Sequence, residues 1–455
     1  MKLKAIILAA GAGTRMKSKL PKVLHKVCGQ TMLHHVIDAA KSSKIEECIA
    51  VIGHGAEKVK ESLDKDVKTV LQEEQLGTGH AVMMAQDYIE EGIVLVLCGD
   101  GPLITEETLN SIMDYHKQGD FKATVLTTDL SNPKGYGRII RDAEGQLEKI
   151  VEEKDTTEEE KAIMEINSGI YCFDGKALKE ALPQLTNNNA QKEYYLTDVL
   201  SIIRNMGFNV GVYKTEEYEE IMAINSKEQL AEVEAIMRKR IAKKHMVNGV
   251  TIINPDHTYI EKTVIIGADT IIYPGAILAG KTTIGEDCII GQNSRIENTT
   301  IGNSVEVQSS TLIDSKVDDY TTIGPYAYLR PNSNIGKHVK IGDFVEVKNS
   351  NIGDHSKASH LAYIGDADVG KNVNVGCGVV FVNYDGKNKN RSIVEDNAFV
   401  GSNANLIAPI TVKKDGYVAC GSTITNDVPE GSLAIARGRQ ENKEGWVEKK
   451  GLLKK

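Results

Sequence analysis

Short apolar runs alternate with amphipathic stretches along the first half of the chain. The apolar runs predict β-strands at residues 3–10, 47–53, 92–100, 122–130, 168–174 and 209–214. The amphipathic stretches predict helices at residues 21–43 and 105–119. Strands that alternate with helices are typical of an α/β fold with a mainly parallel sheet, in which ligands bind at the carboxyl ends of the strands.

The second half of the chain follows a different period, of six residues. Isoleucine, leucine or valine recurs at every sixth position in two runs: Ile266, Ile272, Leu278, Ile284, Ile290 and Ile296, and then Ile323, Leu329, Ile335, Ile341 and Val347. A period of six is typical of a β-helix built from hexapeptide repeats, in which each repeat forms one flat side of a coil. Residues 251–425 therefore predict roughly ten coils at three repeats per coil.

A long helix is predicted between the two halves, at residues 226–246. Ser226 can cap it, and an apolar stripe follows at Leu230, Val233, Ile236, Met237 and Ile241. We interpret this helix as a connector, and the chain then divides into domains at 1–228 and 251–455 with a helical linker at 229–250. Residues 376–391 lack the six-residue period and are predicted to form a loop that leaves the β-helix.

Composition narrows the class of protein. The net charge is −9 and the basic residues are dispersed, which argues against a nucleic-acid-binding surface. The seven cysteines are scattered without a C-x-x-C spacing, which favours a reducing compartment over a zinc site or a disulfide framework. No stretch of 18 apolar residues occurs. We expect a cytoplasmic protein with no nucleic-acid partner and no membrane partner.

Candidate phosphate chemistry begins in the glycine-rich stretch LAAGAGTRMKSKLPKVL at residues 8–24. It lacks the third glycine of the dinucleotide fingerprint and the Gly-Lys-Ser/Thr of a P-loop. Its backbone N–H groups, together with Arg15 and Lys22, suit a bound phosphate. Asp100 follows a buried strand and could hold Mg²⁺, although an Asp-Gly pair alone more often forms a turn. The polar stretch from Gln72 to Gly79 could read a base edge or form a tight turn.

Several motifs together carry a family resemblance. L-A-A-G-x-G-T-R-M…L-P-K, Q-L-G-T-G-H-A, G-D-x-P-L, G-Y-G-R-I, V-E-E-K-D and N-S-G-I, in that order, resemble sugar-nucleotide pyrophosphorylases. With the β-helix added, nearly the whole chain resembles the bifunctional bacterial N-acetylglucosamine-1-phosphate uridyltransferase/glucosamine-1-phosphate N-acetyltransferase family. The resemblance implies a Rossmann-like nucleotidyltransferase domain and a left-handed parallel β-helix. It also implies synthesis of UDP-N-acetylglucosamine, a peptidoglycan precursor, with acetylation before uridyl transfer.

The same resemblance implies the site residues of the first half. The residues expected to contact UTP or UDP-N-acetylglucosamine are Leu8, Ala9, Ala10, Gly11, Lys22, Gln72, Gly77, Thr78, Gly137, Glu152, Asn167 and Asn225. Arg15 and Lys22 would act as catalytic cations on the UTP phosphates, and Asp100 and Asn225 would ligate Mg²⁺. The chain departs from the family pattern at Gly101, usually β-branched, and at Ser168, usually threonine.

In the second half the motif S-H-x-x-Y-x-G-D stands at residues 359–366. Periodicity alone does not select His360 over His355 as a catalytic base, but the resemblance does. It implies that glucosamine-1-phosphate contacts Arg330, Lys348, Tyr363, Asn374 and Lys389. It further implies that acetyl-CoA contacts Cys377, Asn383, Tyr384, Ser402, Cys420 and Arg437, the two cysteines as contact residues without an acyl-carrying role. Related β-helix acyltransferases imply a homotrimer that shares this site between subunits.

Two alternatives compete with the bifunctional enzyme. The first is a single-activity sugar-1-phosphate nucleotidyltransferase with a structural β-helix, against which the H-x-x-Y-x-G-D motif and the N-Y-D-G-x-N-K loop both argue. The second is a scaffold with a degenerate nucleotide-binding half. The joint presence of Arg15, Lys22, Asp100 and Asn225 argues against it.

Overall fold

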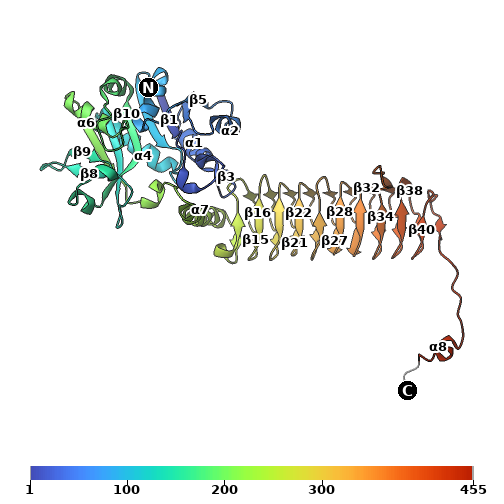
Figure 1. Cartoon of the computed structure of the whole chain (residues 1–455). Helices are drawn as coiled ribbons and strands as arrows, with labels where there is room; N and C mark the ends of the chain where they lie inside the picture. Colours follow the sequence, from blue (N-terminus) through green and yellow to red (C-terminus); the bar gives the residue numbers. More distant parts are fainter. Residues whose placement is uncertain (1, 453–455) are drawn as a thin grey trace. The chain divides into compact units, whose positions relative to one another are not determined.

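The computed structural model describes residues 2–452, so the outer limits of the expected domains, residues 1 and 455, lie outside the described residues. The chain forms two compact units, Met1–Met237 and Arg238–Lys455 (Figure 1). The first is an α/β unit and the second is a β-helix. Helix α7 (Lys227–Val247) supplies the long helix expected between the two periodic halves.

The first unit is built on a mixed sheet of nine strands. Its main path runs β11 (Val210–Lys214), β7 (Ala123–Asp129), β10 (Glu165–Asp174), β6 (Gly92–Cys98), β1 (Lys2–Ala9), β4 (Glu47–Ile52) and β5 (Lys68–Leu71). Strands β8 (Arg138–Arg141) and β9 (Leu147–Val151) form a hairpin that joins the sheet through β10. Along the main path only β10 is antiparallel to its neighbours, which confirms the expected mainly parallel sheet.

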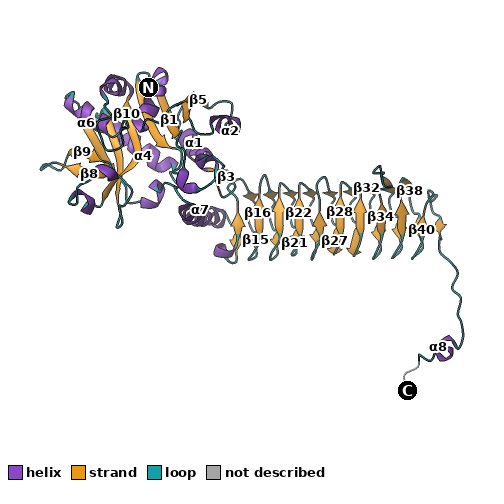
Figure 2. Ribbon diagram, in the orientation of Figure 1, coloured by secondary structure: helices purple, strands orange, loops and turns teal. Residues whose placement is uncertain are grey.

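Helices cover both faces of this sheet (Figure 2). They are α1 (Met32–Ser42), α2 (Ala56–Ser62), α3 (Thr78–Met84), α4 (Glu106–Gln118), α5 (Gly175–Ala181) and α6 (Asp198–Asn205). Successive side chains of a strand point to opposite faces. Ala5 and Ile7 of β1 therefore pack in a core with α1 and α4, while Ile6 packs in a second core with α3, α5 and α6.

One predicted helix was wrong in its first part. Within residues 21–43 only α1 is an α-helix, and a 3₁₀ turn η2 (Lys22–Leu24) and a hairpin of β2 (Lys26–Val27) and β3 (Gln30–Thr31) precede it. The chain turns at Cys28 and Gly29, whose φ angles are 45° and 83°. Thr31 then starts α1, because its side chain accepts a hydrogen bond from the backbone N–H of His34 at 3.2 Å.

The second unit consists of three parallel sheets. The first sheet contains β12 (Thr251–Ile252), β15 (Ile271–Ile272), β18 (Ile289–Ile290), β21 (Glu306–Val307), β24 (Thr322–Ile323), β27 (Lys340–Asp343), β30 (Lys357–His360), β33 (Asn374–Val375), β36 (Phe399–Val400), β39 (Tyr417–Val418) and β41 (Leu433–Ala434). The second sheet contains β13 (Tyr259–Ile260), β16 (Ile277–Ala279), β19 (Arg295–Glu297), β22 (Thr311–Ile313), β25 (Tyr328–Leu329), β28 (Glu346–Lys348), β31 (Tyr363–Gly365), β34 (Val380–Val382), β37 (Asn405–Ile407) and β40 (Thr423–Ile424). The third sheet contains β14 (Ile265–Ile266), β17 (Thr283–Ile284), β20 (Thr300–Ile301), β23 (Lys316–Val317), β26 (Asn334–Ile335), β29 (Asn351–Ile352), β32 (Ala367–Val369), β35 (Ser392–Val394) and β38 (Ile410–Val412).

Each coil contributes one strand to each sheet, and the six-residue apolar positions fill the core. Ile272, Leu278 and Ile284 are buried on the three successive sides of one coil. Some coils are shorter than three full repeats: Thr283 pairs with Thr300, and Arg295 pairs with Thr311. These short coils explain why the period visible in the sequence breaks after Ile296 and resumes at Ile323.

The predicted insertion loop begins later than residues 376–391. Residues 380–382 form β34, and the side chain of Phe381 is completely buried in the core. Only residues 383–391 leave the coil, because Ser392 already pairs with Ala367 in the third sheet. The stretch Val379-Val380-Phe381 is apolar because it belongs to the β-helix core and not to the loop.

Residues 438–452 of the charged C-terminal segment are exposed and include the short helix α8 (Trp446–Lys449). Within the described residues, no helix combines the length and the apolar character that crossing a bilayer requires.

Candidate functional site

The first unit has a cleft at the carboxyl ends of β1, β5 and β6. This N-terminal cleft has a volume of about 300 Å³ and is bordered by the glycine-rich loop on one side. The sequence-predicted residues that line it are Leu8, Ala9, Ala10, Gly11, Lys22, Gln72, Gly77, Thr78 and Asp100. The parallel sheet brings these segments together because β1 and β6 are neighbours and end at the same edge.

A second hollow of about 260 Å³ continues the N-terminal cleft and shares Leu8, Thr78, Cys98 and Asp100 with it. The remaining residues predicted for the first half line this hollow: Arg15, Gly137, Glu152, Asn167 and Asn225. All of the first-half predictions therefore converge on one continuous cleft within one unit.

Lys22 lines the N-terminal cleft and contacts two other predicted site residues. Its ammonium forms an ion pair with the Asp100 carboxylate and donates a hydrogen bond to Asn225 Oδ1 at 2.6 Å. The two oxygens therefore converge on a single cation position. A carboxylate and an amide oxygen are ligands that Mg²⁺ accepts, with its remaining positions filled by water and substrate phosphates. The donor set fits a divalent ion held jointly by the protein and a bound triphosphate.

The glycine loop explains how Lys22 reaches this position. Gly13 has a φ of 59°, and a Cβ placed there would lie 2.5 Å from Lys22 Cβ. Glycine is therefore needed at residue 13, both for the left-handed backbone and for the close approach of Lys22. At Gly11, in contrast, a Cβ would meet no atom within 4 Å, because this residue borders the open cleft.

The second hollow presents oriented hydrogen-bonding groups. Asn167 donates from Nδ2 to the Tyr171 hydroxyl at 2.7 Å and accepts at Oδ1 from the Gly169 N–H at 3.0 Å. Burial raises the pKa of Glu152, and the negative charge of Asp198 raises it further. Such groups suit a neutral, hydroxyl-rich ligand that donates and accepts hydrogen bonds.

In the β-helix, His360 ends β30 at the corner between the first and second sheets. Its Nδ1 lies 2.5 Å from Asp343 Oδ1 on the preceding coil, because β27 and β30 pair these two residues directly. The hydrogen bond with His360 lowers the pKa of Asp343, so this carboxylate is ionised at neutral pH. An ionised acceptor at Nδ1 requires the proton there, which leaves Nε2 free to accept a proton.

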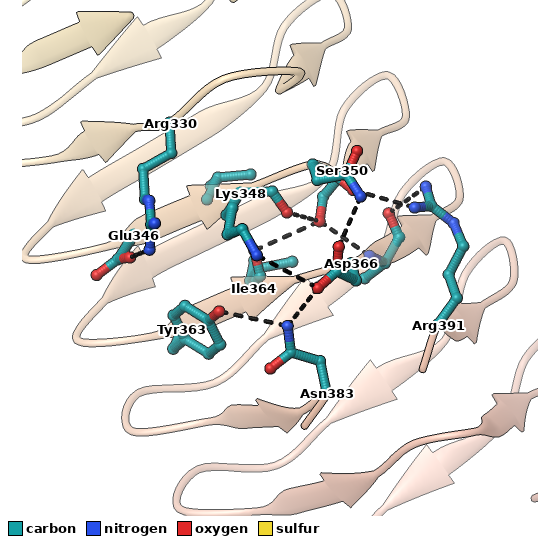
Figure 3. A network of polar contacts seen from close by, with 12 residues as sticks. Arg330, Glu346, Lys348, Ser350, Tyr363, Ile364, Asp366, Asn383 and Arg391 are labelled. Atoms are coloured by element: carbon teal, nitrogen blue, oxygen red, sulfur yellow. Dashed lines mark hydrogen bonds and ion pairs between the residues drawn. The ribbon is translucent and has the colours of Figure 1, made fainter. Parts of the chain in front are cut away.

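A group of cations lies at and beside the second sheet beyond this corner, and Figure 3 shows two of them, Arg330 and Lys348. Arg330 forms an ion pair with Glu346 at 2.8 Å. Glu346 and Lys348 lie on the same strand, β28. The neighbouring ammonium of Lys348 lowers the pKa of Lys389, so the two cationic side chains lie close together. Arg330, Lys348, Tyr363 and Lys389 therefore share one side of the β-helix, and paired cations of this kind suit a phosphate.

Asn374 is the one predicted sugar-phosphate residue that lies apart from this group. It is on β33 of the first sheet, where it pairs with Lys357 at the start of β30. His360 is at the other end of that strand, about 10 Å along it at the rise of a β-strand. One small ligand at the His360 corner does not extend to Asn374 of the same chain.

Four of the six residues predicted to hold acetyl-CoA lie in a column along the corner after the first sheet. Cys377, Ser402 and Cys420 each stand two residues after core valines that pair in register, at 375, 400 and 418. Both cysteines are exposed, and neither forms a disulfide. Arg437 lies beside the end of this column, where its Cδ is 4.0 Å from the Cβ position of Gly421. Asn383 and Tyr384 start the insertion loop one corner further on.

Comparisons with known proteins agree with this division of the chain. The nucleotidyl transferase family matches residues 4–218, and the hexapeptide repeat of bacterial transferases, as six repeats, matches residues 263–298. The Bifunctional protein GlmU of Alkaliphilus oremlandii (strain OhILAs) is 82% identical over 455 residues, with 100% of both chains covered. That of Clostridioides difficile (strain 630) is 62% identical over 451 residues, covering 99% of this chain and 98% of the relative. The chain belongs to the GlmU family.

Membership of the GlmU family confirms the expected bifunctional enzyme. The chain joins a uridyltransferase for N-acetylglucosamine-1-phosphate to an N-acetyltransferase for glucosamine-1-phosphate, in the synthesis of a cell-wall precursor. High sequence identity to bifunctional relatives over the full chain argues against both alternatives, the single-activity nucleotidyltransferase and the scaffold. A divalent metal is consistent with nucleotidyl transfer in this family, and hexapeptide repeats suggest an oligomer.

A solved structure of UDP-glucose pyrophosphorylase complexed with UDP-glucose is similar to part of the chain. The match covers 53% of this chain and 100% of that one, at 18% sequence identity and a TM-score of 0.45.

Sequence reasoning missed two residues of these candidate sites. In the N-terminal cleft it missed Cys98, whose thiol has a pKa raised to about 12 by burial and by the charge of Asp100. A thiol of this kind packs against the ligand space and is not a nucleophile. In the β-helix it missed Asp343. The available signal was its position 17 residues, one short coil, before His360.

Proposed function

We propose that the N-terminal cleft performs uridyl transfer and that the His360 corner performs acetyl transfer. Residues 1–228 would form the uridyltransferase, residues 229–250 the linker and residues 251–455 the acetyltransferase. One observation carries the proposal: each unit holds its own set of polar groups suited to one of the two reactions. The cluster of Lys22, Asp100 and Asn225 is suited to offsetting phosphate charge, and the His360–Asp343 pair is suited to accepting a proton.

For uridyl transfer, the residue roles follow from the charges of the reactants. An oxygen of the sugar phosphate attacks the α-phosphorus of UTP, and the bond to pyrophosphate breaks. The attacking oxygen is already ionised, so no general base is required, and the main obstacle is the repulsion between two anions. Arg15 and Lys22 offset that repulsion and orient the phosphates. Asp100 and Asn225 hold Mg²⁺, which supplies further charge neutralisation when it is bound.

The two ends of the cleft then bind different parts of UDP-N-acetylglucosamine. Leu8 to Gly11 contact the uridine nucleotide together with Gln72, Gly77 and Thr78, because these residues line the glycine-loop end. The buried hydrogen-bonding groups of Gly137, Glu152 and Asn167 contact the N-acetylglucosamine group in the second hollow.

For acetyl transfer, His360 Nε2 takes a proton from the amine of glucosamine-1-phosphate as the nitrogen attacks the thioester carbonyl of acetyl-CoA. The carbon–sulfur bond breaks, and coenzyme A leaves as the thiol after taking that proton from His360. Asp343 holds the imidazole in the tautomer that this step requires. Arg330, Lys348 and Lys389 bind the phosphate, and Tyr363 contacts the sugar. Asn383 and Ser402 polarise the reacting groups, while Cys377, Tyr384, Cys420 and Arg437 contact acetyl-CoA.

The exposed column and the separate position of Asn374 support a homotrimer with a shared acetyltransferase site. In such a trimer the Asn374 of one subunit completes the sugar-phosphate site at the His360 corner of another. We further propose that the enzyme works in the cytoplasm, where UTP and acetyl-CoA are available and its seven free cysteines stay reduced.

Mixed trimers test the shared site. We expect His360→Ala and Asn374→Ala subunits to be nearly inactive in acetyl transfer when purified separately. Co-expressed, they form some sites with both native residues, and acetyl transfer rises several-fold above the sum of the two parents. The acetyltransferase rate of the co-purified mixture gives the result. A rate equal to that sum would place Asn374 and His360 in the same subunit's site.

A Gly11→Ala substitution tests the nucleotide role of the N-terminal cleft. Because the added methyl group meets no protein atom within 4 Å, we expect unchanged thermal unfolding. The methyl group enters the space assigned to the nucleotide, so the KM for UTP rises about tenfold, equivalent to about 1.4 kcal/mol. Gly438→Ala is the matched control, since a Cβ there also meets nothing within 4 Å. Wild-type UTP kinetics in Gly11→Ala would move the nucleotide away from this loop.

A further inference from the structure

The corner between the second and third sheets carries a column of residues with positive φ. On four successive coils these residues are Asp314, Asn332, Asn349 and Asp366, with φ of 44°, 63°, 47° and 50°. Asparagine and aspartate tolerate this backbone conformation about equally. The corner therefore accounts for an Asn or Asp at each position, but it does not account for a negative charge.

Asp366 differs from the other aspartate of the column in its surroundings. Asp314 is exposed, whereas the side chain of Asp366 is only 9% exposed. Burying a carboxylate is costly unless it is paired and hydrogen-bonded. Burial raises the pKa of Asp366, but hydrogen bonds from Asn349 and Asn383 and the charge of Lys348 lower it below its usual value. The group is ionised at neutral pH.

The partners of Asp366 connect it to the acetyltransferase site (Figure 3). Asn349 donates to Oδ1 at 2.6 Å, Asn383 donates to Oδ2 at 2.5 Å, and the Lys348 ammonium lies 3.6 Å from Oδ2. Asn383 also lies 3.4 Å from the Tyr363 hydroxyl. Lys348 has the ammonium of Lys389 as its other neighbour, which repels it. The Asp366 carboxylate offsets that repulsion and holds Lys348 in place.

The base of the insertion loop is fixed at the same corner. Arg391 binds Asp368 through both Nε and Nη2 at 2.5 Å and donates to the backbone carbonyls of Asn349 and Ala367 at 3.0 and 3.1 Å. A forked guanidinium–carboxylate pair is geometrically specific. The loop that carries Asn383 and Lys389 is thus held against the coil on which Asp366 lies.

We propose that Asp366 is a positioning residue for acetyl transfer, whose carboxylate fixes Lys348 and Asn383 before glucosamine-1-phosphate binds. The inference rests on the proposed role of Lys348 as a ligand of the sugar phosphate. Groups held in place before binding contribute more affinity, because less of the binding energy is lost in ordering them. Asp366 itself touches neither substrate.

The test is a double-mutant cycle in the full-length enzyme, with glucosamine-1-phosphate varied at saturating acetyl-CoA. We expect Asp366→Asn to raise the KM for glucosamine-1-phosphate at least tenfold. In the Lys348→Met background the same substitution changes that KM less than threefold, because its effect acts through Lys348. Asp314→Asn is the matched control, with the same substitution at the equivalent corner and an expected wild-type KM.

The outcomes separate the two claims. Equal fold changes of the KM in both backgrounds, or no change from Asp366→Asn alone, would overturn the positioning role. A wild-type KM in Lys348→Met would instead overturn the phosphate site on which it rests. The fold is checked by the uridyltransferase activity and thermal unfolding of each variant. The exchange Asp366→Asn/Asn383→Asp, which returns a carboxylate to the same hydrogen bond, is expected to lower the KM again relative to Asp366→Asn.

Discussion

Replacing His360 with alanine is expected to reduce acetyl transfer by at least about a hundredfold, the usual contribution of a general base. The reason is chemical. The amine of glucosamine-1-phosphate must lose a proton as the new carbon–nitrogen bond forms, and among the described groups His360 is placed to accept it at Nε2 while Asp343 holds Nδ1. Uridyl transfer from UTP to N-acetylglucosamine-1-phosphate should stay at the wild-type rate, because the residues assigned to it lie in the other unit.

The measurement is release of coenzyme A thiol from acetyl-CoA, followed in parallel with pyrophosphate release from UTP. His355→Ala is the matched control. His355 is an exposed histidine of the preceding corner, with its ring stacked on that of His338 at 4.8 Å. Its loss should leave acetyl transfer unchanged. Acetyl transfer by His360→Ala within a few-fold of wild type would remove this residue from the role of base.

Replacing Asp100 with asparagine is expected to reduce uridyl transfer by at least about a hundredfold while acetyl transfer continues. The substitution keeps the size of the side chain but removes its charge. Lys22 then loses its ion-pair partner, and the cation position between Asp100 and Asn225 loses its anionic ligand. Each factor of ten in rate corresponds to about 1.4 kcal/mol of transition-state stabilisation, and a bound metal ion supplies several kcal/mol.

Pyrophosphate release at saturating UTP and N-acetylglucosamine-1-phosphate, repeated over a Mg²⁺ titration, measures this effect. Asp114→Asn, at an exposed carboxylate on α4, is the control for a charge change in the same unit. An Asp100→Asn enzyme with wild-type rate and Mg²⁺ dependence would rule out the proposed metal position. Loss of both activities in a folded variant would contradict independent sites.

The N-terminal cleft was largely predictable because it depends on a general rule of parallel sheets. Once residues 3–10 and 92–100 are assigned to strands, the loops that follow them must meet at one edge. This places the glycine loop beside Asp100. What the pattern did not show was the hairpin at residues 26–31, where a positive φ at Cys28 interrupts a stretch with the apolar spacing of a helix.

The sequence pattern predicted the β-helix architecture, but it did not predict which residues of neighbouring coils pair with each other. The period of six identifies the core residues, yet a contact between coils depends on the length of each coil. Asp343 meets His360 because that coil has 17 residues, whereas Lys337 and Asp319 are 18 residues apart. One residue more or less would place a different side chain opposite His360. The differences in coil length fall at corners, where the pattern carries little information.

The extent of the insertion loop shows the same limit. Phe381 keeps the six-residue phase set by Val369 and Val375, but Gly376 and Gly378 before it and the polar residues 383–391 after it obscure that phase in the sequence. Burial of Phe381 in the core decides the matter, and only the three-dimensional structure shows it.

The most direct test of the account uses the wild-type enzyme with UTP, Mg²⁺ and glucosamine-1-phosphate as the only sugar phosphate. Pyrophosphate release is measured with and without acetyl-CoA. The account predicts little release without acetyl-CoA. With it, coenzyme A thiol should appear first, followed by pyrophosphate in equal final amount, because the acetylated sugar phosphate is the substrate of the N-terminal cleft. Pyrophosphate release at the same rate in both conditions, or thiol release with no pyrophosphate at all, would contradict it.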